Sequence, residues 1–105
     1  MKIEIRVIED YLPEETRTLI SEKGEIKKGS KIIAKPIITY EYSGRVEKAT
    51  LMMIVEDIVM NRNSFHISCK VEEVIELEVN EGYDAETEKG DYVAIKVEEV
   101  SEILS

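Results

Sequence analysis

Cys69 and His66 are the residues best suited to nucleophilic chemistry, and each is the only one of its kind in the chain. A cysteine nucleophile needs a base within hydrogen-bond reach to take its proton. Both residues fall in the stretch from Phe65 to Val79, whose apolar and polar side chains alternate as in a half-buried strand. An odd spacing along a strand sends the two side chains to opposite faces. We therefore interpret Cys69 as a core residue and His66 as a solvated one.

Asp84, Glu86 and Glu88 alternate as the first ligands of an EF-hand calcium loop do. The rest of that pattern fails, because the glycine comes one position late, at Gly90, and Ile95 stands where the bidentate glutamate belongs. One Cys and one His cannot form a zinc site, and the scattered glycines form no phosphate-binding loop. No carboxylate pair stands out from the many others. We predict no metal, no cofactor and no enzymatic activity.

Negative charge is concentrated in the last third of the chain. The segment from Glu72 to Ser105 holds twelve acidic residues and two lysines, and the whole chain has a net charge of −9. The carboxylates of such a surface repel one another, but they attract a basic partner, and the association rate falls with added salt. The predicted partner-binding acidic surface consists of Glu72, Glu76, Glu78, Glu81, Asp84, Glu86, Glu88, Asp91 and Glu98.

A basic stretch supports an alternative interpretation as a small nucleic-acid-binding module. Cationic grooves with aromatic platforms hold single strands, and a five-stranded barrel of the OB type presents such a groove. Residues 89–97, KGDYVAIKV, resemble the start of a barrel strand. The net negative charge counts against this alternative. Its candidate residues are Lys23, Lys27, Lys28, Lys31, Lys35, Tyr40, Tyr42 and Arg45.

Several strands must position these residues. The segment from Val46 to Met60 fits a strand or a helix, and hairpin-like residues on both sides favour the strand. We expect the strand that starts near Asp91 to pair with the one before it, with Leu77 opposite Val93 and Ile75 opposite Ile95. The inverted pattern at residues 73–74 indicates either a bulge or the point where the strand leaves one neighbouring strand for another. The predicted strands cover residues 3–7, 32–42 with a break at Pro36, 46–60, 65–79 and 91–99.

Two short helices complete the expected fold. Pro13 with two following glutamates predicts a helix that runs to Lys23, with Gly24 as its cap. Val100 to Leu104 could add a closing helical turn. The prediction is a single domain over residues 1–105 of the α+β class, mainly an antiparallel sheet of four to six strands.

Composition points to an intracellular protein. The lone cysteine favours a reducing compartment, and the charged N-terminus lacks the apolar region of a secretion signal. The longest uncharged run, Ala49 to Val55, is too short to cross a bilayer. We expect a cytoplasmic protein without a membrane partner. Many Ile, Glu and Lys residues and no Gln favour a thermophilic source.

In size, residue usage and the acidity of Glu72 to Glu102, the chain resembles small acidic proteins of viruses that infect archaea, among them anti-CRISPR inhibitors. The resemblance implies an inhibitor or nucleic-acid mimic that covers a basic, nucleic-acid-handling partner in the host cytoplasm. It includes no motif that assigns a role to a particular residue. A homodimer through Leu51 to Val55, or through an exposed strand edge, is a third interpretation.

Overall fold

The structure is a computed structural model that describes residues 4–6, 18–40, 42–61 and 64–105. Nearly all of its regular structure is strand. In chain order the elements are β1 (Glu4–Arg6), β2 (Thr18–Ser21), β3 (Gly24–Lys27), β4 (Lys31–Ala34), β5 (Ile37–Tyr40), β6 (Arg45–Asn61), β7 (Ser64–Val79), β8 (Tyr92–Ile95), the 3-10 turn η2 (Val97–Glu99) and β9 (Val100–Ile103).

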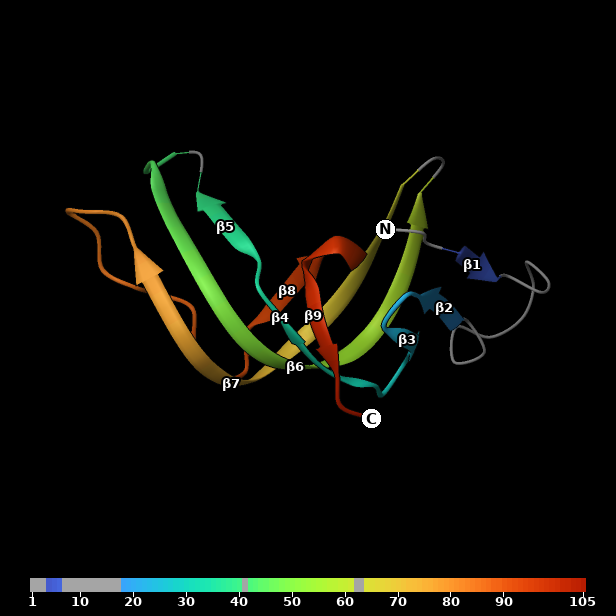
Figure 1. The fold of residues 1–105 in the computed structure, drawn as a ribbon. Coiled ribbons are helices and arrows are strands. Elements are labelled where there is room, and N and C mark those ends of the chain that lie inside the picture. The colour runs from blue at the N-terminus through green and yellow to red at the C-terminus, as the bar shows by residue number, and fades with distance from the viewer. Residues whose placement is uncertain (1–3, 7–17, 41, 62–63) are drawn as a thin grey trace.

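A long antiparallel hairpin of β6 and β7 organises the molecule. The two strands pair from Glu47↔Val79 to Asn61↔Ser64, so the preference for a strand over residues 46–60 is confirmed. Figure 1 shows the hairpin bent into a U, with β4, β8 and β9 across its middle, β5 beside one arm and β2 and β3 beside the other. Every other strand of the larger sheet is attached directly or indirectly to this hairpin.

Three irregularities in the ladder allow the hairpin to bend. The register shifts leave Glu72 and Ile75 of β7 and Glu56 of β6 without a partner of their own. Such bulges bend a strand and increase its twist. They also change which residues face inward, since Val74 packs against the core while Ile75 is 49% exposed. The predicted bulge near residues 73–74 is confirmed.

The larger sheet has the order β8-β7-β6-β4-β9, and β5 also pairs with β6 beyond the end of β4. The break between β4 and β5 falls at residues 35–36, as Pro36 predicts. A smaller sheet, β1-β2-β3, contributes Leu19 and Ile26 to the same core. The core is formed by the inward row of β6 (Ala49, Leu51, Met53, Val55 and Ile58) with residues of neighbouring elements that include Ile32, Ile67, Cys69, Val71, Ile95, Val97 and Val100.

The fold is more purely β than expected, since no α-helix occurs among the described residues. The helix predicted up to Lys23 is wrong over residues 18–23, where the chain forms β2 and the turn into β3, and residues 13–17 lie outside the described residues. A tight turn with Gly24 at a φ of 130° replaces the helix cap. The helical turn expected over residues 100–104 is also wrong, because β9 pairs there with β4.

The predicted pairing of the last strands is wrong in register. Strand β8 lies opposite Ile67 to Lys70, so Val93 is the partner of Cys69 and Ile95 the partner of Ile67. Residues 80–91 therefore run back along β7 instead of closing a tight hairpin. β8 also ends at Ile95, and the chain turns through η2 where a continuing strand was expected.

Candidate functional site

The acidic loop that connects β7 to β8, residues 80–91, is fastened to the sheet at its first residue. The side-chain oxygen of Asn80 accepts a hydrogen bond from Val46 N at 2.9 Å, and its amide nitrogen donates to Gly44 O at 3.1 Å. One side chain therefore holds the start of this loop to the turn between β5 and β6.

Two further contacts fix the shape of the loop. The Tyr83 hydroxyl donates to Ser43 O on the same β5–β6 turn. At the far end, Glu88 N donates to Asp91 Oδ2 at 3.0 Å, and Val71 N donates to Asp91 O at 2.8 Å. The carboxylate of Asp91 thus serves the internal structure of the loop.

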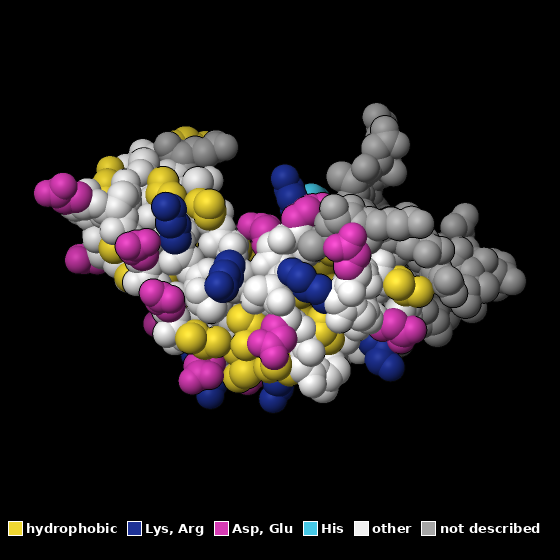
Figure 2. Space-filling view, viewed as in Figure 1, with side chains coloured by type: hydrophobic (Ala, Val, Ile, Leu, Met, Phe, Trp, Pro, Cys, Tyr) yellow, Lys and Arg dark blue, Asp and Glu magenta, His cyan; other side chains and the backbone are white. Residues whose placement is uncertain are grey.

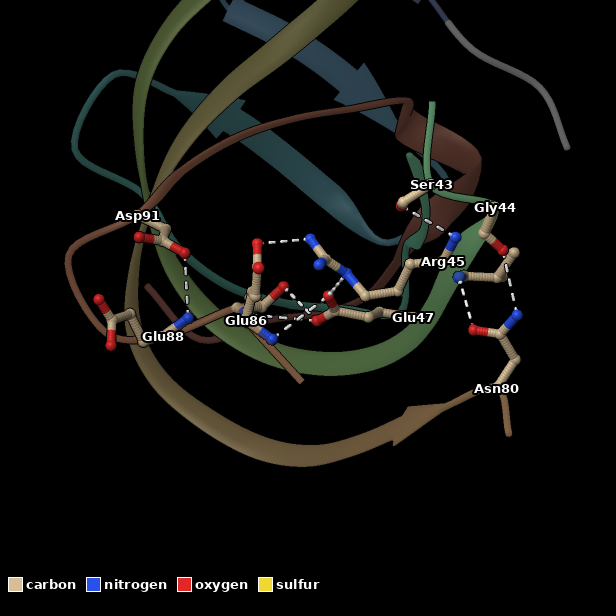
Figure 3. A network of polar contacts seen from close by, with 10 residues as sticks. Ser43, Gly44, Arg45, Glu47, Asn80, Glu86, Glu88 and Asp91 are labelled. Atoms are coloured by element: carbon tan, nitrogen blue, oxygen red, sulfur yellow. Dashed lines mark hydrogen bonds and ion pairs between the residues drawn. The ribbon is translucent and has the colours of Figure 1, made fainter. Parts of the chain in front are cut away.

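The middle of the loop is held by Glu47, whose side chain is completely buried. Its carboxylate accepts hydrogen bonds from Thr87 Oγ1 at 2.8 Å, Thr87 N at 3.1 Å and Glu86 N at 3.4 Å (Figure 3). Glu47 lies in the inward row of β6, two positions before Ala49. A carboxylate buried there loses its hydration and needs hydrogen-bond donors from the protein, and the loop supplies them.

Arg45, also buried, completes the network. Its Nε lies 2.9 Å from Glu47 Oε2 as an ion pair without the alignment of a hydrogen bond, and its Nη2 donates to the Glu86 carboxylate. The guanidinium also stacks on Tyr40, 3.7 Å from the ring centroid. Arg45 therefore links β5, β6 and the loop.

The network shifts the acidity of both charged groups. Burial by itself raises the pKa of Glu47, but hydrogen bonds from Thr87 and Glu86 and the charge of Arg45 outweigh it and lower this pKa below its usual value. The hydrogen bond to Glu86 raises the pKa of Arg45 above its usual value. Glu47 is consequently an ionised carboxylate within the fold at neutral pH.

The predicted acidic residues of β7 differ in their exposure to solvent. Glu76 and Glu78 are exposed on the convex side of the sheet, opposite Thr50 and Lys48. Glu72 occupies a bulge and is half-buried. Of the three, only Glu76 and Glu78 are therefore exposed side chains at successive alternate positions of β7.

The acidic residues of the loop remain exposed. We call Glu76, Glu78, Glu81, Asp84, Glu86 and Glu88 the acidic wing. Within the described part of the chain, Glu86 alone among them forms an ion pair, and its side chain is still 63% exposed. Figure 2 shows acidic side chains on the left of the molecule, with basic side chains beside them. The structure therefore places six exposed carboxylates on the last part of β7 and on the loop that follows it.

The two other predicted acidic residues lie apart from the acidic wing. Asp91 is half-buried and occupied with the loop backbone. Glu98 is exposed in η2 and is not a cross-strand neighbour of β7, because β8 pairs elsewhere.

The predicted basic residues are spread over several elements. Tyr40 and Arg45 are used by the buried network, so neither is free to contact a nucleic acid. Lys23 donates from its Nζ to Val100 O, and Tyr42 stands fully exposed on the β5–β6 turn. The remaining lysines are distributed along residues 27–35, with Lys27, Lys28 and Lys35 exposed and Lys31 half-buried.

The residues that sequence reasoning missed are Glu47, Thr87 and Asn80. A signal existed for Glu47, because alternation along β6 places it in the row of Ala49, Leu51 and Met53. A charged residue in a buried row calls for a partner. Nothing in the sequence identified that partner as Thr87.

Among the described residues, no three side chains of the metal-binding types come together, and no helix is long and apolar enough to cross a membrane. Comparison with protein-family models, curated proteins and solved structures found no match to this chain. The function is therefore argued from the site alone.

Proposed function

We propose that this chain is a non-enzymatic binding protein whose acidic wing engages a basic surface of a partner protein. The observation that carries the proposal is the buried carboxylate of Glu47, which fixes the acidic loop in one position. A loop that served only solubility would need no such tether. Preorganisation of this kind lowers the entropy cost of binding.

The energetics of the tether support a role beyond stability. A buried ion pair such as Arg45 with Glu47 contributes little net stability, because desolvation offsets the attraction, and apolar side chains often serve as well. The loop it holds also brings carboxylates close together, which costs repulsion energy. Both costs are understandable if the position of the charges matters for binding.

The charge on the acidic wing indicates the chemistry of the partner. Five of its six carboxylates form no ion pair among the described residues, so they are available to Lys or Arg side chains of another protein. Such a surface suits an inhibitor that covers a nucleic-acid-handling groove, including the anti-defence role of viral proteins. It does not suit a direct contact with phosphates, which the carboxylates would repel.

Charge reversal tests the proposal. The triple variant Glu76→Lys/Glu78→Lys/Glu81→Lys should lose capture of its partner from host lysate, with the association rate reduced at least about tenfold. The matched control Glu25→Lys/Glu98→Lys/Glu102→Lys makes the same change in net charge at exposed positions off the wing and should retain capture. Equal capture by the two triple variants would refute the role of the acidic wing.

A further inference from the structure

Two strands of the larger sheet have an edge that no described strand occupies. Strand β5 pairs only with β6, and β8 pairs only with β7. Successive antiparallel pairings from β5 to β8 make these two strands antiparallel to each other. Both strands line one cavity of about 520 Å³, so their unoccupied edges border a common groove.

The hydrogen-bond pattern identifies the free backbone groups on β5. Ala49 N donates to Pro36 O at 3.1 Å, and hydrogen-bonded pairs alternate along an antiparallel ladder. Ile38 and Tyr40 therefore bond to β6. The N–H and C=O groups of Ile37 and Thr39 face the other way, toward the unoccupied edge.

The same reasoning applies to β8. Val71 N donates to Asp91 O at 2.8 Å, so Val93 is directed toward β7. The N–H and C=O groups of Tyr92 and Ala94 are then the free ones. Each edge offers two residues, and all four border the cavity.

The groove has a definite chemistry. Ile37 and Tyr92, 58% and 69% exposed, present apolar surface from its two sides. Asp91 and Glu99 also line it, and no Lys or Arg is among its lining residues in the described chain. A segment that fits there must be extended, must supply backbone hydrogen bonds, and must carry positive charge.

We propose that an extended cationic segment of a partner protein binds in the groove by adding a β-strand to β5 or β8. The proposal rests on the proposed function, since it assumes a basic protein partner and names the part of it that is bound. Strand addition derives affinity from main-chain hydrogen bonds and specificity from alternate side chains. Here one row of side chains would contact the apolar rim, and Lys or Arg side chains would reach the two carboxylates. Because the acidic loop leads directly into β8, a partner on the acidic wing can reach the groove.

A defined peptide tests this with no knowledge of the partner. The probe is a capped peptide of about nine residues that alternates Lys and Val, with a Glu/Val peptide of the same length as control. With the Lys/Val peptide we expect NMR shifts at the four edge amides and at least about tenfold slower hydrogen exchange there. Absence of these changes at about 1 mM peptide, or equal binding of the Glu/Val peptide, would overturn the proposal.

Proline variants test the backbone contact itself. Thr39→Pro and Ala94→Pro each remove one edge N–H that no ladder bond uses, a position where a sheet tolerates proline. Thr39→Val and Ala94→Val keep the N–H and serve as matched controls. At least one proline variant should bind the peptide at least about tenfold more weakly, while both valine controls bind as the parent does. If neither proline variant weakens binding although circular dichroism shows both folded, strand addition is refuted.

Charge-neutral variants cover the case in which a proline prevents folding. Asp91→Asn and Glu99→Gln retain an acceptor for Glu88 N and Lys96 N, the backbone groups that these side chains bond. Together they should weaken peptide binding at least about fivefold, and no change would overturn the proposal. Edge amides that become protected with rising protein concentration alone would show a second copy in the groove, which also overturns it.

The outcomes for the groove and for the acidic wing are separable. If the wing triple variant loses partner capture while the peptide fails to bind, the proposed function stands and the groove proposal fails. If the peptide binds at the edges while the wing triple variant captures the partner as well as its control does, the groove proposal stands and the proposed function of the acidic wing fails.

Discussion

Among single substitutions in the acidic loop and the residues that hold it, Glu47→Ala should lower the free energy of unfolding most, because it removes the buried carboxylate. The substitution deprives Thr87 and Glu86 of their acceptor and leaves the Arg45 guanidinium buried beside a cavity. Breaking a buried charge pair from one side costs about 3–5 kcal/mol. A domain of this size has a total stability of about 5–15 kcal/mol, so the variant should fold but lose a large part of its margin.

The companion variant Glu47→Gln separates charge from shape. Glutamine keeps the volume and one acceptor oxygen, so no cavity forms, but the charge that partners Arg45 is lost. We expect a cost of about 2–3 kcal/mol, below that of the alanine variant. Exposed Glu81→Gln in the same loop is the control and should change stability by less than about 0.5 kcal/mol.

Urea unfolding followed by circular dichroism measures these differences. With an m-value of about 2 kcal/mol per molar urea, the alanine variant should move the midpoint down by about 2 M. Native-state hydrogen exchange should show the loss first at the amides of Glu86 and Thr87. A midpoint within about 0.5 M of the parent would refute the view that Glu47 holds the loop.

Three other predictions follow from single residues. The native fold lowers the pKa of Glu47 below its usual value of 4.5, so at acid pH the unfolded chain binds more protons than the native one. The ionised Glu47 side chain therefore adds to the free energy of unfolding in full above pH 4.5, and this contribution is lost as the pH falls through the native pKa. Glu47→Gln should consequently flatten the acid side of a plot of stability against pH. Burial, with a smaller effect of Glu56, raises the pKa of Cys69 to about 12, so alkylation by iodoacetamide at pH 8 should proceed only as fast as unfolding exposes the thiol; rapid labelling of the native protein would contradict its burial. Gly44→Ala should cost about 1–2 kcal/mol in urea unfolding, because Gly44 has a φ of 77° and an added Cβ would lie 3.3 Å from the Tyr83 hydroxyl; an unchanged midpoint would contradict that backbone conformation.

Local patterns predicted the strands well and their partners less well. Alternation identified β7, and Pro36 identified the break between β4 and β5, because each depends on neighbouring residues alone. The register of β8 depends on where a twelve-residue connection places it, and that is decided by contacts of the connection with β6, where Glu47 accepts a hydrogen bond from Thr87 N and Val46 N donates one to Asn80. No local pattern contains this information.

The incorrect prediction of a helix up to Lys23 has a similar explanation. Pro13 and the glutamates after it are genuine helix-start signals, yet Leu19 and Ile26 are fully buried in the shared core as members of paired strands. Tertiary burial of these two side chains outweighs a helix propensity of a few tenths of a kcal/mol per residue.

The candidate site was predicted in its composition but not in its construction. The excess of carboxylates after Glu72 is visible in the sequence, and six of the nine predicted residues are exposed on the last part of β7 and the loop that follows it. The sequence does not reveal which carboxylates form contacts within the fold and are therefore not available to a partner. Asp91 braces the loop, and Glu72 is drawn into a bulge.

The β6–β7 hairpin also has a consequence for the order of folding. Its strands are adjacent in the chain and can zip from their connecting turn with little loop-closure entropy, whereas β9 reaches β4 across a large separation, as in the bond from Ser101 Oγ to Ile33 O between residues 68 positions apart. We expect the hairpin to form the folding nucleus and β9 to dock last. Destabilising changes in the centre of the hairpin should then slow folding, and those in β9 should mainly speed unfolding.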